Sequence, residues 1–340
     1  QEFRLFNNRL WGDFNYYTRD DKDQIISVTS APQSGYSTRK MNAGLIRNRG
    51  VELSLGGMPV STKNWKWEMN FNIAKNSNKL VELADGVDSY SIYWTSFTTR
   101  LYNYAMVGKS LGVITGNTWE RDDNGNIIFH ELSASQKALY GGEYVPTYNQ
   151  NTLDELGNFH PDFTGGFNTS ISFKNFRLSA NIDFSVGGQI VSYTNMWGSS
   201  SGILDKTAEL NDRGVNVREP VSKGGGIHMT GVDQNGNKVD TYVNAKLYYT
   251  TASRVWEEWV YDRTYVKLRE VSLSYVFPSQ TLKKLNIGLS RVSVAINASN
   301  PWLIYSACPN VDVSEIGMGY FEGGNAAATR SIDFSVYLAF

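Results

Sequence analysis

The stretch from Ser331 to Phe340, which reads SIDFSVYLAF, predicts a β-strand with one apolar face. Every second residue from Ile332 onward is large and apolar, whereas serine, aspartate, tyrosine and alanine fill the positions between them. A period of two indicates a half-buried strand. Soluble domains rarely end on such a strand, because chain termini usually fray. A strand that is apolar outward, polar inward and closed by an aromatic residue is typical of the wall of an outer-membrane barrel.

Seven further stretches of the chain alternate in the same way. In each of them, apolar residues at every second position alternate with residues such as asparagine, serine, aspartate, arginine or glutamate. The complete set predicts eight strands, at residues 9–16, 51–56, 66–73, 166–173, 176–186, 270–277, 291–298 and 331–340.

Short and long connections alternate between these strands. Lys174-Asn175 forms a two-residue hairpin turn, and residues 58–64 and 278–288 make short links, the second with one helical turn at Leu282–Leu285. The remaining connections are far longer and cover residues 81–162, 191–262 and 304–329. Outer-membrane barrels have tight periplasmic turns and long extracellular loops, whereas structureless loops of this length are uncommon in compact soluble domains. We therefore expect an all-β transmembrane barrel with long extracellular loops and a periplasmic C-terminus.

The first residues indicate a strand that precedes the first complete one. Glu2–Phe6 reads as the end of a strand, and Asn7-Asn8 as a tight turn into the strand that begins at Arg9. An unpaired strand edge in lipid leaves backbone groups unsatisfied, and a barrel of eight strands encloses only side chains. We therefore expect residues 1–340 to be the C-terminal part of a much larger barrel.

Composition narrows the class of function. Lys and Arg number 32 against 33 Asp and Glu, so the basic excess that nucleic-acid binding requires is absent. No run approaches the roughly 18 apolar residues of a membrane helix. The single Cys308 cannot form an internal disulfide, and we expect a buried or loop thiol. Aromatic residues make up 13% of the chain, which suits interfacial belts and contacts with sugars or peptides, although a tyrosine-rich β core would give the same proportion.

Several short motifs, each occurring once, follow one another from one end of the chain to the other. They are residues 5–10 (LFNNRL) and 13–17 (DFNYY), 42–44 (NAG) and 47–53 (RNRGVEL), 65–67 (WKW), 70–72 (NFN) and 76–80 (NSNKL), 161–167 (PDFTGGF), 265–271 (YVKLREV) and the terminal Phe340. In this order they resemble the SusC/RagA family of TonB-dependent outer-membrane transporters of Bacteroidetes. The resemblance is specific because the motifs span nearly the whole chain.

The resemblance implies a function and a set of partners. Members of the family have a 22-stranded barrel, a plug domain inside it and a TonB box near the N-terminus, and they typically pair with a SusD-like surface lipoprotein. Plug and TonB box are not present in residues 1–340. The resemblance thus implies TonB-dependent import of an oligomeric nutrient, a glycan or a peptide, across the outer membrane. Its implied partners are the SusD-like lipoprotein, TonB, the N-terminal barrel and plug, and outer-membrane lipid.

The sequence offers candidates for substrate contact but none for catalysis. Trp94, Trp119 and Trp197 lie in the long segments, and Trp256 and Trp259 flank two glutamates just before a strand. Aromatic faces stack on sugar rings or hold peptide side chains; packing against the barrel rim or the lipoprotein is the alternative for the last pair. We predict no enzymatic site and no cofactor. The two remaining interpretations are an outer-membrane barrel enzyme, and a soluble glycan-binding or adhesin protein.

Two sets of residues are candidates for metal binding, and neither set has the spacing that metal ligands require. His130, His160 and His228 are far apart in sequence. The runs at residues 122–126 (DDNGN) and 233–237 (DQNGN) carry glycine fourth instead of sixth and lack the distal glutamate of a calcium loop. We predict that their Asn-Gly pairs form type I′ hairpin turns.

Overall fold

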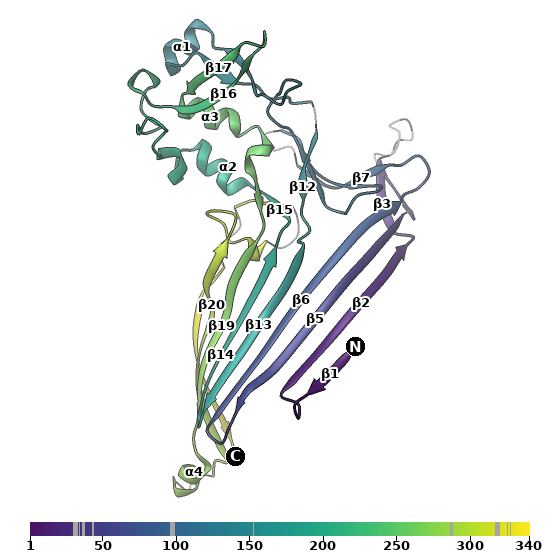
Figure 1. The fold of residues 1–340 in the computed structure, drawn as a ribbon, viewed down its shortest axis with the longest axis vertical. Helices are drawn as coiled ribbons and strands as arrows, with labels where there is room; N and C mark the ends of the chain where they lie inside the picture. The colour runs from purple at the N-terminus through teal and green to yellow at the C-terminus, as the bar shows by residue number, and fades with distance from the viewer. Residues whose placement is uncertain are drawn as a thin grey trace.

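Nine antiparallel strands form one long sheet, the wall sheet, which makes up the lower part of the molecule in Figure 1. The computed structural model describes residues 1–340 apart from 30–32, 34, 36–37, 43, 96–98, 152, 286–287, 317–319, 325 and 327. In sheet order the strands are β1 (Glu2–Leu5), β2 (Leu10–Lys22), β5 (Leu45–Ser61), β6 (Trp65–Glu82), β13 (Phe163–Phe173), β14 (Phe176–Val186), β19 (Tyr265–Val276), β20 (Arg291–Ser306) and β22 (Ser331–Ala339).

All eight predicted strands are confirmed, and so is the strand that precedes them. β1 pairs with β2 across a turn in which Phe6, Asn7 and Asn8 have positive φ. β2, β5 and β6 extend well beyond their predicted ends toward the long connections. The additional residues of β6, such as those at 75–79, are polar on both faces, so they carry no period-two signal.

The register separates the wall sheet into an apolar and a polar face. One row of neighbouring side chains crosses the sheet through Trp67, Ile171, Leu178, Leu273, Ile296 and Phe334. Many apolar side chains on this face are strongly exposed; Phe334, for instance, retains 68% of its accessible surface. Exposed apolar patches of more than a few hundred Å² are rare on soluble monomers and mark contact with a membrane or a partner.

Aromatic side chains lie at both ends of this apolar face. At the end with short turns, Trp65 packs on Phe173 with ring centroids 4.3 Å apart, and Phe176 packs on Tyr275 at 4.6 Å. At the other end of β13, Phe163 lies beneath the ammonium group of a lysine at 4.9 Å. The eleven residues from Phe163 to Phe173 span about 34 Å along the strand, or about 26 Å at a tilt of about 40°. That height matches the apolar band of outer-membrane barrels, which is about 25 Å.

Short links join the strands at one end of the wall sheet. The two-residue turn at Lys174-Asn175 is confirmed, with Lys174 at a φ of 53°. The predicted helical turn is also confirmed, as α4 (Ser279–Leu285), which lies at this end of the molecule (Figure 1). The longer connections all leave from the opposite end, including residues 23–44, which hold β3 (Ile25–Thr29) and β4 (Thr38–Asn42).

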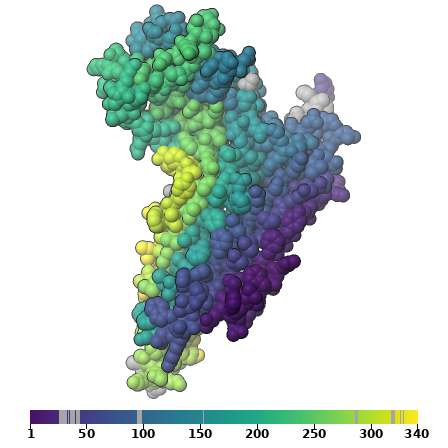
Figure 2. Space-filling model, in the orientation of Figure 1, coloured from purple at the N-terminus to yellow at the C-terminus, as the bar shows by residue number. Residues whose placement is uncertain are grey.

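A second body, which we call the module, rises above the wall sheet at that opposite end (Figures 1 and 2). It is formed by the described residues within 83–162, 187–264 and 307–330. Its helices are α1 (Ala134–Tyr140), α2 (Tyr193–Ser200) and α3 (Ala245–Ala252), with short 3-10 helices η2 (Asp205–Ala208), η3 (Val221–Lys223), η4 (Trp256–Trp259) and η5 (Val313–Glu315). The module has three small sheets among its described residues. The first contains β7 (Ser89–Thr95), β8 (Leu101–Met106), β9 (Val113–Gly116) and β12 (Asp154–Asn158). The second contains β10 (Ile128–Glu131), β11 (Tyr144–Pro146), β16 (Ile227–Asp233) and β17 (Lys238–Val243), and the third contains β15 (Gln189–Ser192), β18 (Val260–Asp262) and β21 (Phe321–Glu322).

Local sequence explains the short module helices. α1 begins with a capping box in which Ser133 and Gln136 satisfy each other's backbone N–H groups, and it ends at Gly141 in the left-handed conformation. α3 begins at Asn244, whose side chain accepts from the backbone N–H groups of Lys246 and Leu247. Within the described residues, none of the helices combines the length and apolar character needed to cross a lipid bilayer.

Candidate functional site

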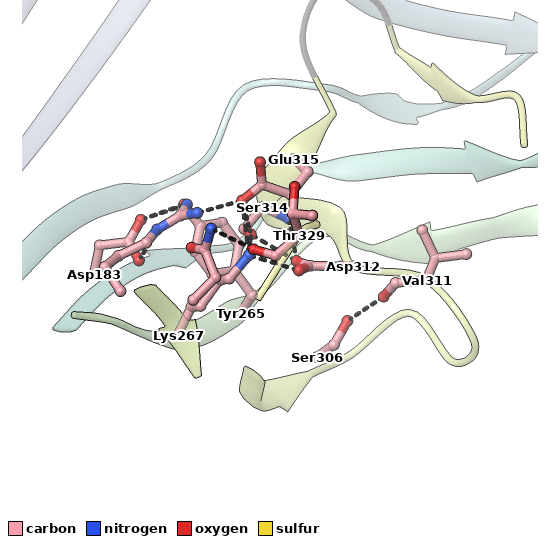
Figure 3. A network of polar contacts seen from close by, with 11 residues as sticks. Asp183, Tyr265, Lys267, Ser306, Val311, Asp312, Ser314, Glu315 and Thr329 are labelled. Atoms are coloured by element: carbon pink, nitrogen blue, oxygen red, sulfur yellow. Dashed lines mark hydrogen bonds and ion pairs between the residues drawn. The ribbon is translucent and has the colours of Figure 1, made fainter. Parts of the chain in front are cut away.

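The module contacts the polar face of the wall sheet through one of its own segments, which we call the strap and which comprises residues 307–316 and 320–324. The strap leaves β20 and carries η5, whose side chains reach Lys267 on the polar face of β19 (Figure 3). It then enters the core of the module at Tyr320 and Phe321. A single segment thus contacts both the polar face of the wall sheet and the rest of the module. The charged contacts around η5 form the candidate site.

Lys267 is the centre of this site, and it is 1% exposed. Its ammonium nitrogen donates to Asp312 Oδ2 at 2.7 Å, to Glu315 Oε1 at 2.7 Å and to Ser314 Oγ at 3.1 Å. An ammonium group has three donors, so every proton of this buried cation has a partner. Burying an unpaired charge is very costly, which makes the strap residues necessary for Lys267 to lie where it does.

A break in strand pairing brings a second cation to the same place. The register of β19 shifts between Leu268 and Glu270 against β20 and in the same region against β14, so Arg269 has no partner residue in either strand. Its guanidinium binds both carboxylate oxygens of Asp183, at 2.8 and 3.0 Å, and also pairs with Glu315. Bulges of this kind redirect side chains at the rims of barrels. Here the bulge places Arg269 between the wall and the strap.

The two cations lower the pKa values of the strap carboxyl groups. Burial alone would raise the pKa of Asp312, but hydrogen bonds from Lys267 and Ser314 outweigh it and hold the pKa below its ordinary value. The hydrogen bond from Lys267 also lowers the pKa of Glu315, with a further contribution from Arg269. Both groups are therefore charged at neutral pH and contribute to strap attachment in that form.

We expect acid to detach the strap. Because the folded pKa values of Asp312 and Glu315 lie below their unfolded values of about 4, their contribution is present above that pH and is lost as the pH falls through the folded values. Hydrogen–deuterium exchange at residues 311–316, corrected for the chemical exchange rate, should lose protection below about pH 4. The variant D312N/E315Q should show weak protection that does not change with pH. Wild-type protection that persists unchanged at pH 3 would contradict this assignment.

The far end of the strap binds the start of helix α2. Glu322 is 2% exposed and accepts from Ser192 Oγ at 2.9 Å and from the backbone N–H of Thr194 at 3.1 Å. A carboxylate at the first turn of a helix satisfies N–H groups that have no partner within the helix. Nearby, Asn195 donates to the backbone oxygen of Pro309 at 2.9 Å. The strap therefore fixes α2 at two points.

The expected status of Cys308 is confirmed. The thiol is 1% exposed, and Asn195 Nδ2 approaches its sulfur at 3.6 Å. Burial raises the pKa of Cys308 to about 12. A thiol that stays protonated at neutral pH is a poor nucleophile, so Cys308 acts as a packed side chain at the base of the strap.

Three of the five candidate tryptophans lie inside the module. Trp119, Trp256 and Trp259 are 2%, 0% and 1% exposed and belong to one apolar cluster, in which Trp256 stacks on Tyr193 at 5.1 Å. The Trp119 indole N–H donates to Glu258 at 2.6 Å, and that of Trp259 donates to the Ala252 carbonyl oxygen at 2.7 Å. These contacts favour a supporting role for the three side chains.

The other two candidates are placed differently. Trp197 is on α2 and is 43% exposed. Trp94 belongs to β7, and its side chain lies outside the described residues. The structure brings Trp119, Trp256 and Trp259 together and leaves Trp197 at the surface. A role in ligand contact stays a prediction for all five.

The prediction of type I′ turns at the two Asn-Gly pairs is wrong. A type I′ turn requires positive φ at both central residues, but only Gly125 and Gly236 have it, and neither Asn124 nor Asn235 does. In the first run the Asp122 carboxylate accepts from the backbone N–H groups two and four residues further on, and Asp233 repeats this in the second. The carboxylates thus stabilise a three-residue loop with glycine at its last position.

No cluster of three or more histidine, cysteine or acidic residues suited to a metal ion is found in the described part of the chain. His228 does have acidic neighbours: its two ring nitrogens lie 2.8 Å from Asp212 and 2.8 Å from Asp240, and its ring stacks on Tyr242. These contacts join the hairpin of β16 and β17 to the loop before it.

Five charged residues of the site were not predicted from the sequence to be functional: Lys267, Arg269, Asp312, Glu315 and Glu322. One signal was available for the first two, because a Lys-x-Arg pair in an alternating strand places two cations on one face of a strand that is otherwise uncharged there. The acidic partners lie 45 and 48 residues away from Lys267. Nothing in a single sequence pairs groups over such distances.

Comparison with known proteins identifies relatives along most of the chain. The TonB-dependent receptor P3 of Formosa agariphila is 28% identical over 316 residues, which cover 91% of this chain and 29% of the receptor. The TonB-dependent receptor SusC of Bacteroides thetaiotaomicron is 30% identical over 198 residues, or 56% of this chain and 19% of SusC. The chain spans less than a third of the length of these relatives. No family model matches.

A solved structure shares the fold. The RagAB peptide importer in its closed-closed state superimposes with a TM-score of 0.70 and 18% identity, covering all of this chain and 34% of the importer chain. These relatives are TonB-dependent receptors, and the two-faced sheet suits the wall of a β-barrel. The chain is SusC/RagA-like in sequence and fold. The relatives are receptors and transporters, which is in keeping with a role other than catalysis.

Proposed function

We propose that residues 1–340 supply part of the barrel wall and the outer loops of a transporter that imports an oligomeric nutrient, glycan or peptide, across the outer membrane with energy from TonB. The observation that carries this proposal is the wall sheet itself. Its apolar face has about the height of the apolar band of a barrel and carries aromatic side chains at both ends, its opposite face is polar, and all its longer connections gather at one end.

The edges of the wall sheet support a larger barrel. Within the described residues β1 pairs only with β2, and β22 pairs only with β20. Strand edges cannot face lipid, because each unsatisfied backbone group there costs several kcal/mol. Further strands would therefore pair with both edges, as in the proposed 22-stranded barrel whose plug and TonB box lie in other parts of the protein. The short turns would face the periplasm with the C-terminus, and the module would face outward.

This chain would serve as the rigid part of the machine. TonB would act on the plug, while a SusD-like lipoprotein would hold and release the nutrient above the module. The ion pairs of the strap would keep the module seated on the wall during these movements. Among the five candidate tryptophans, the exposure of Trp197 suits direct contact with substrate or lipoprotein, and Trp119, Trp256 and Trp259 would support the surface around it.

Purification of the protein and measurement of nutrient uptake test this function. The full-length protein, purified from outer membranes, should carry a plug-bearing N-terminal portion and should copurify with a SusD-like lipoprotein. Uptake of labelled oligosaccharides or peptides by cells should depend on this protein and should cease when TonB is removed. Uptake that continues without TonB, or a protein that is extracted without detergent, would rule the proposal out.

A further inference from the structure

The apolar face of the wall sheet becomes basic where β2, β5 and β6 continue beyond the apolar band (Figure 1). On β6 the alternation that places Ile73 on the apolar face places Lys75 and Lys79 on the same face, closer to the module. Ile73 is opposite Leu53 on β5, and the same register sets Lys79 opposite Arg47. One face of these strands therefore passes from aliphatic to basic side chains within a short length.

Five basic side chains share this part of the face, which we call the basic patch: Lys22 of β2, Arg47 and Arg49 of β5, and Lys75 and Lys79 of β6. Two acidic residues lie among them. Arg47 binds both carboxylate oxygens of Asp20, at 2.7 and 2.8 Å, and Glu82 is opposite Leu45 beyond a bulge. The patch therefore keeps an excess of positive charge.

Most of this positive charge is available to a partner. Lys22, Arg49, Lys75 and Lys79 are exposed. The side chains of Lys22, Arg49 and Lys79 form no hydrogen bond or ion pair with another described residue. The ammonium group of Lys75 lies 4.9 Å from the centre of the Phe163 ring, a contact that leaves its charge unneutralised.

The polar face at the same height has a different composition. Asn76 donates to Asn48 at 3.4 Å, and the charged pair there is Arg19 with Asp21 at 2.6 Å. Amides and one balanced ion pair thus occupy the side that would line the barrel. The excess of positive charge lies on the opposite side, which continues the apolar face.

The height of the basic patch matches the headgroup layer of a bilayer. Lys75 lies level with Phe163, the aromatic residue at the module end of the apolar band. From Lys75 to Lys79 the patch rises about 14 Å along the strand, or about 10 Å at a tilt of about 40°. The polar layer on each side of the hydrocarbon core is about 5–8 Å thick, and long basic side chains can bend toward it. The cations therefore lie at and just above the level of the headgroups.

The chemistry of the patch selects a phosphate-bearing lipid. Arginine and lysine both bind phosphate, and arginine can do so through two parallel hydrogen bonds. Each basic side chain near an anionic membrane surface strengthens binding about fivefold. Immediately below, side chains such as Ile73 and Leu53 offer an apolar surface to acyl chains. Cations above and aliphatic groups below fit the two parts of one lipid molecule.

We propose that the basic patch binds the phosphate groups of lipids in the outward-facing leaflet, while the acyl chains of these lipids pack on the apolar face below. This inference rests on the proposed function, which places the wall sheet in the outer membrane with the module outward. Because three neighbouring strands supply the cations, the bound phosphates hold this side of the barrel at a fixed depth in the bilayer.

The test uses the full-length transporter in phosphatidylcholine vesicles. A bimane label on I73C in a C308S background reports on lipid at the lower edge of the patch. A small fraction of the lipid carries a nitroxide near the head of one acyl chain and is either phosphatidic acid or phosphatidylcholine. We expect the labelled phosphatidic acid to quench bimane more strongly than the same fraction of labelled phosphatidylcholine.

A double variant and a matched control assign this preference to the patch. R49Q/K79Q should lower the ratio of the two quenching constants at least about fivefold, toward one. R19Q/K246Q removes the same charge from the polar face of β2 and from α3, and it should leave the ratio unchanged. Heat-modifiable migration in gels verifies that each variant is folded.

The remaining outcomes separate this inference from the proposed function. Equal quenching by the two lipids in the wild type, or a preference that persists in R49Q/K79Q, would overturn the inference and leave the membrane placement standing. Loss of the preference in millimolar inorganic phosphate, but not in chloride of equal ionic strength, would assign the patch to a soluble anion and would also overturn it. Quenching by neither lipid would instead refute the placement of the wall sheet in the membrane.

Discussion

Replacing Lys267 by methionine is expected to release the strap from the wall sheet. Methionine retains most of the buried volume but removes the charge, so Asp312 loses its cation and Glu315 keeps only Arg269. Breaking one partner of a buried ion pair costs about 3–5 kcal/mol. In the full-length protein, hydrogen–deuterium exchange should show that the free energy of local opening at residues 311–316 is lower than in the wild type by about 3–5 kcal/mol.

The control for this prediction is K283M, which removes an exposed lysine from α4 at the opposite end of the molecule. It should leave exchange in the strap unchanged. Adding D312N and E315Q to K267M removes the uncompensated charges, and the triple variant should recover much of the lost protection. Wild-type protection in K267M alone would show that packing, and not charge, holds the strap.

Replacing Trp256 by alanine is expected to unfold the module while the wall sheet remains. The side chain is fully buried between Tyr193 and the rest of the aromatic cluster. Truncating a buried tryptophan to alanine costs about 3–5 kcal/mol through lost contacts and the cavity left behind. Protease cleavage should therefore appear within residues 187–264, while heat-modifiable migration in gels continues to report a folded barrel.

Trp197 provides the matched comparison for Trp256. Because its side chain is 43% exposed, W197A should change module stability by less than about 0.5 kcal/mol. If Trp197 contacts the nutrient or the lipoprotein, the same variant should weaken binding without added cleavage. Cleavage of W197A equal to that of W256A would contradict the assignment of one tryptophan to the surface and the other to the core.

The wall strands could be predicted from sequence because one physical constraint acts along each of them. Residues such as Leu178 and Leu273 belong on the apolar face and Ser179 and Ser272 on the polar face, so the pattern repeats with a period of two. Where β5 and β6 continue beyond the apolar band, both faces carry polar residues and the signal disappears. The predicted strands therefore stop short of the observed ends.

The module and the strap could not be predicted in the same way. Burial of Trp256 and Trp259 depends on packing between segments far apart in the chain, and exposed and buried tryptophans look alike in one sequence. The contact of Glu322 with the start of α2 joins groups 130 residues apart. Prediction of the Asn-Gly turns failed for a local reason, because the aspartate side chains compete for the turn N–H groups.

Accessibility of spin labels along three neighbouring strands tests the central claim, that the apolar face contacts lipid and the polar face lines a water-filled or plugged interior. Single cysteines at Leu178, Leu273 and Ile296, and at Ser179, Ser272 and Asn297, would carry labels in a C308S background of the full-length protein in membranes. We predict high collision rates with oxygen at the first three positions and low rates at the second three. Equal access of a water-soluble nickel chelate to both sets would contradict the account.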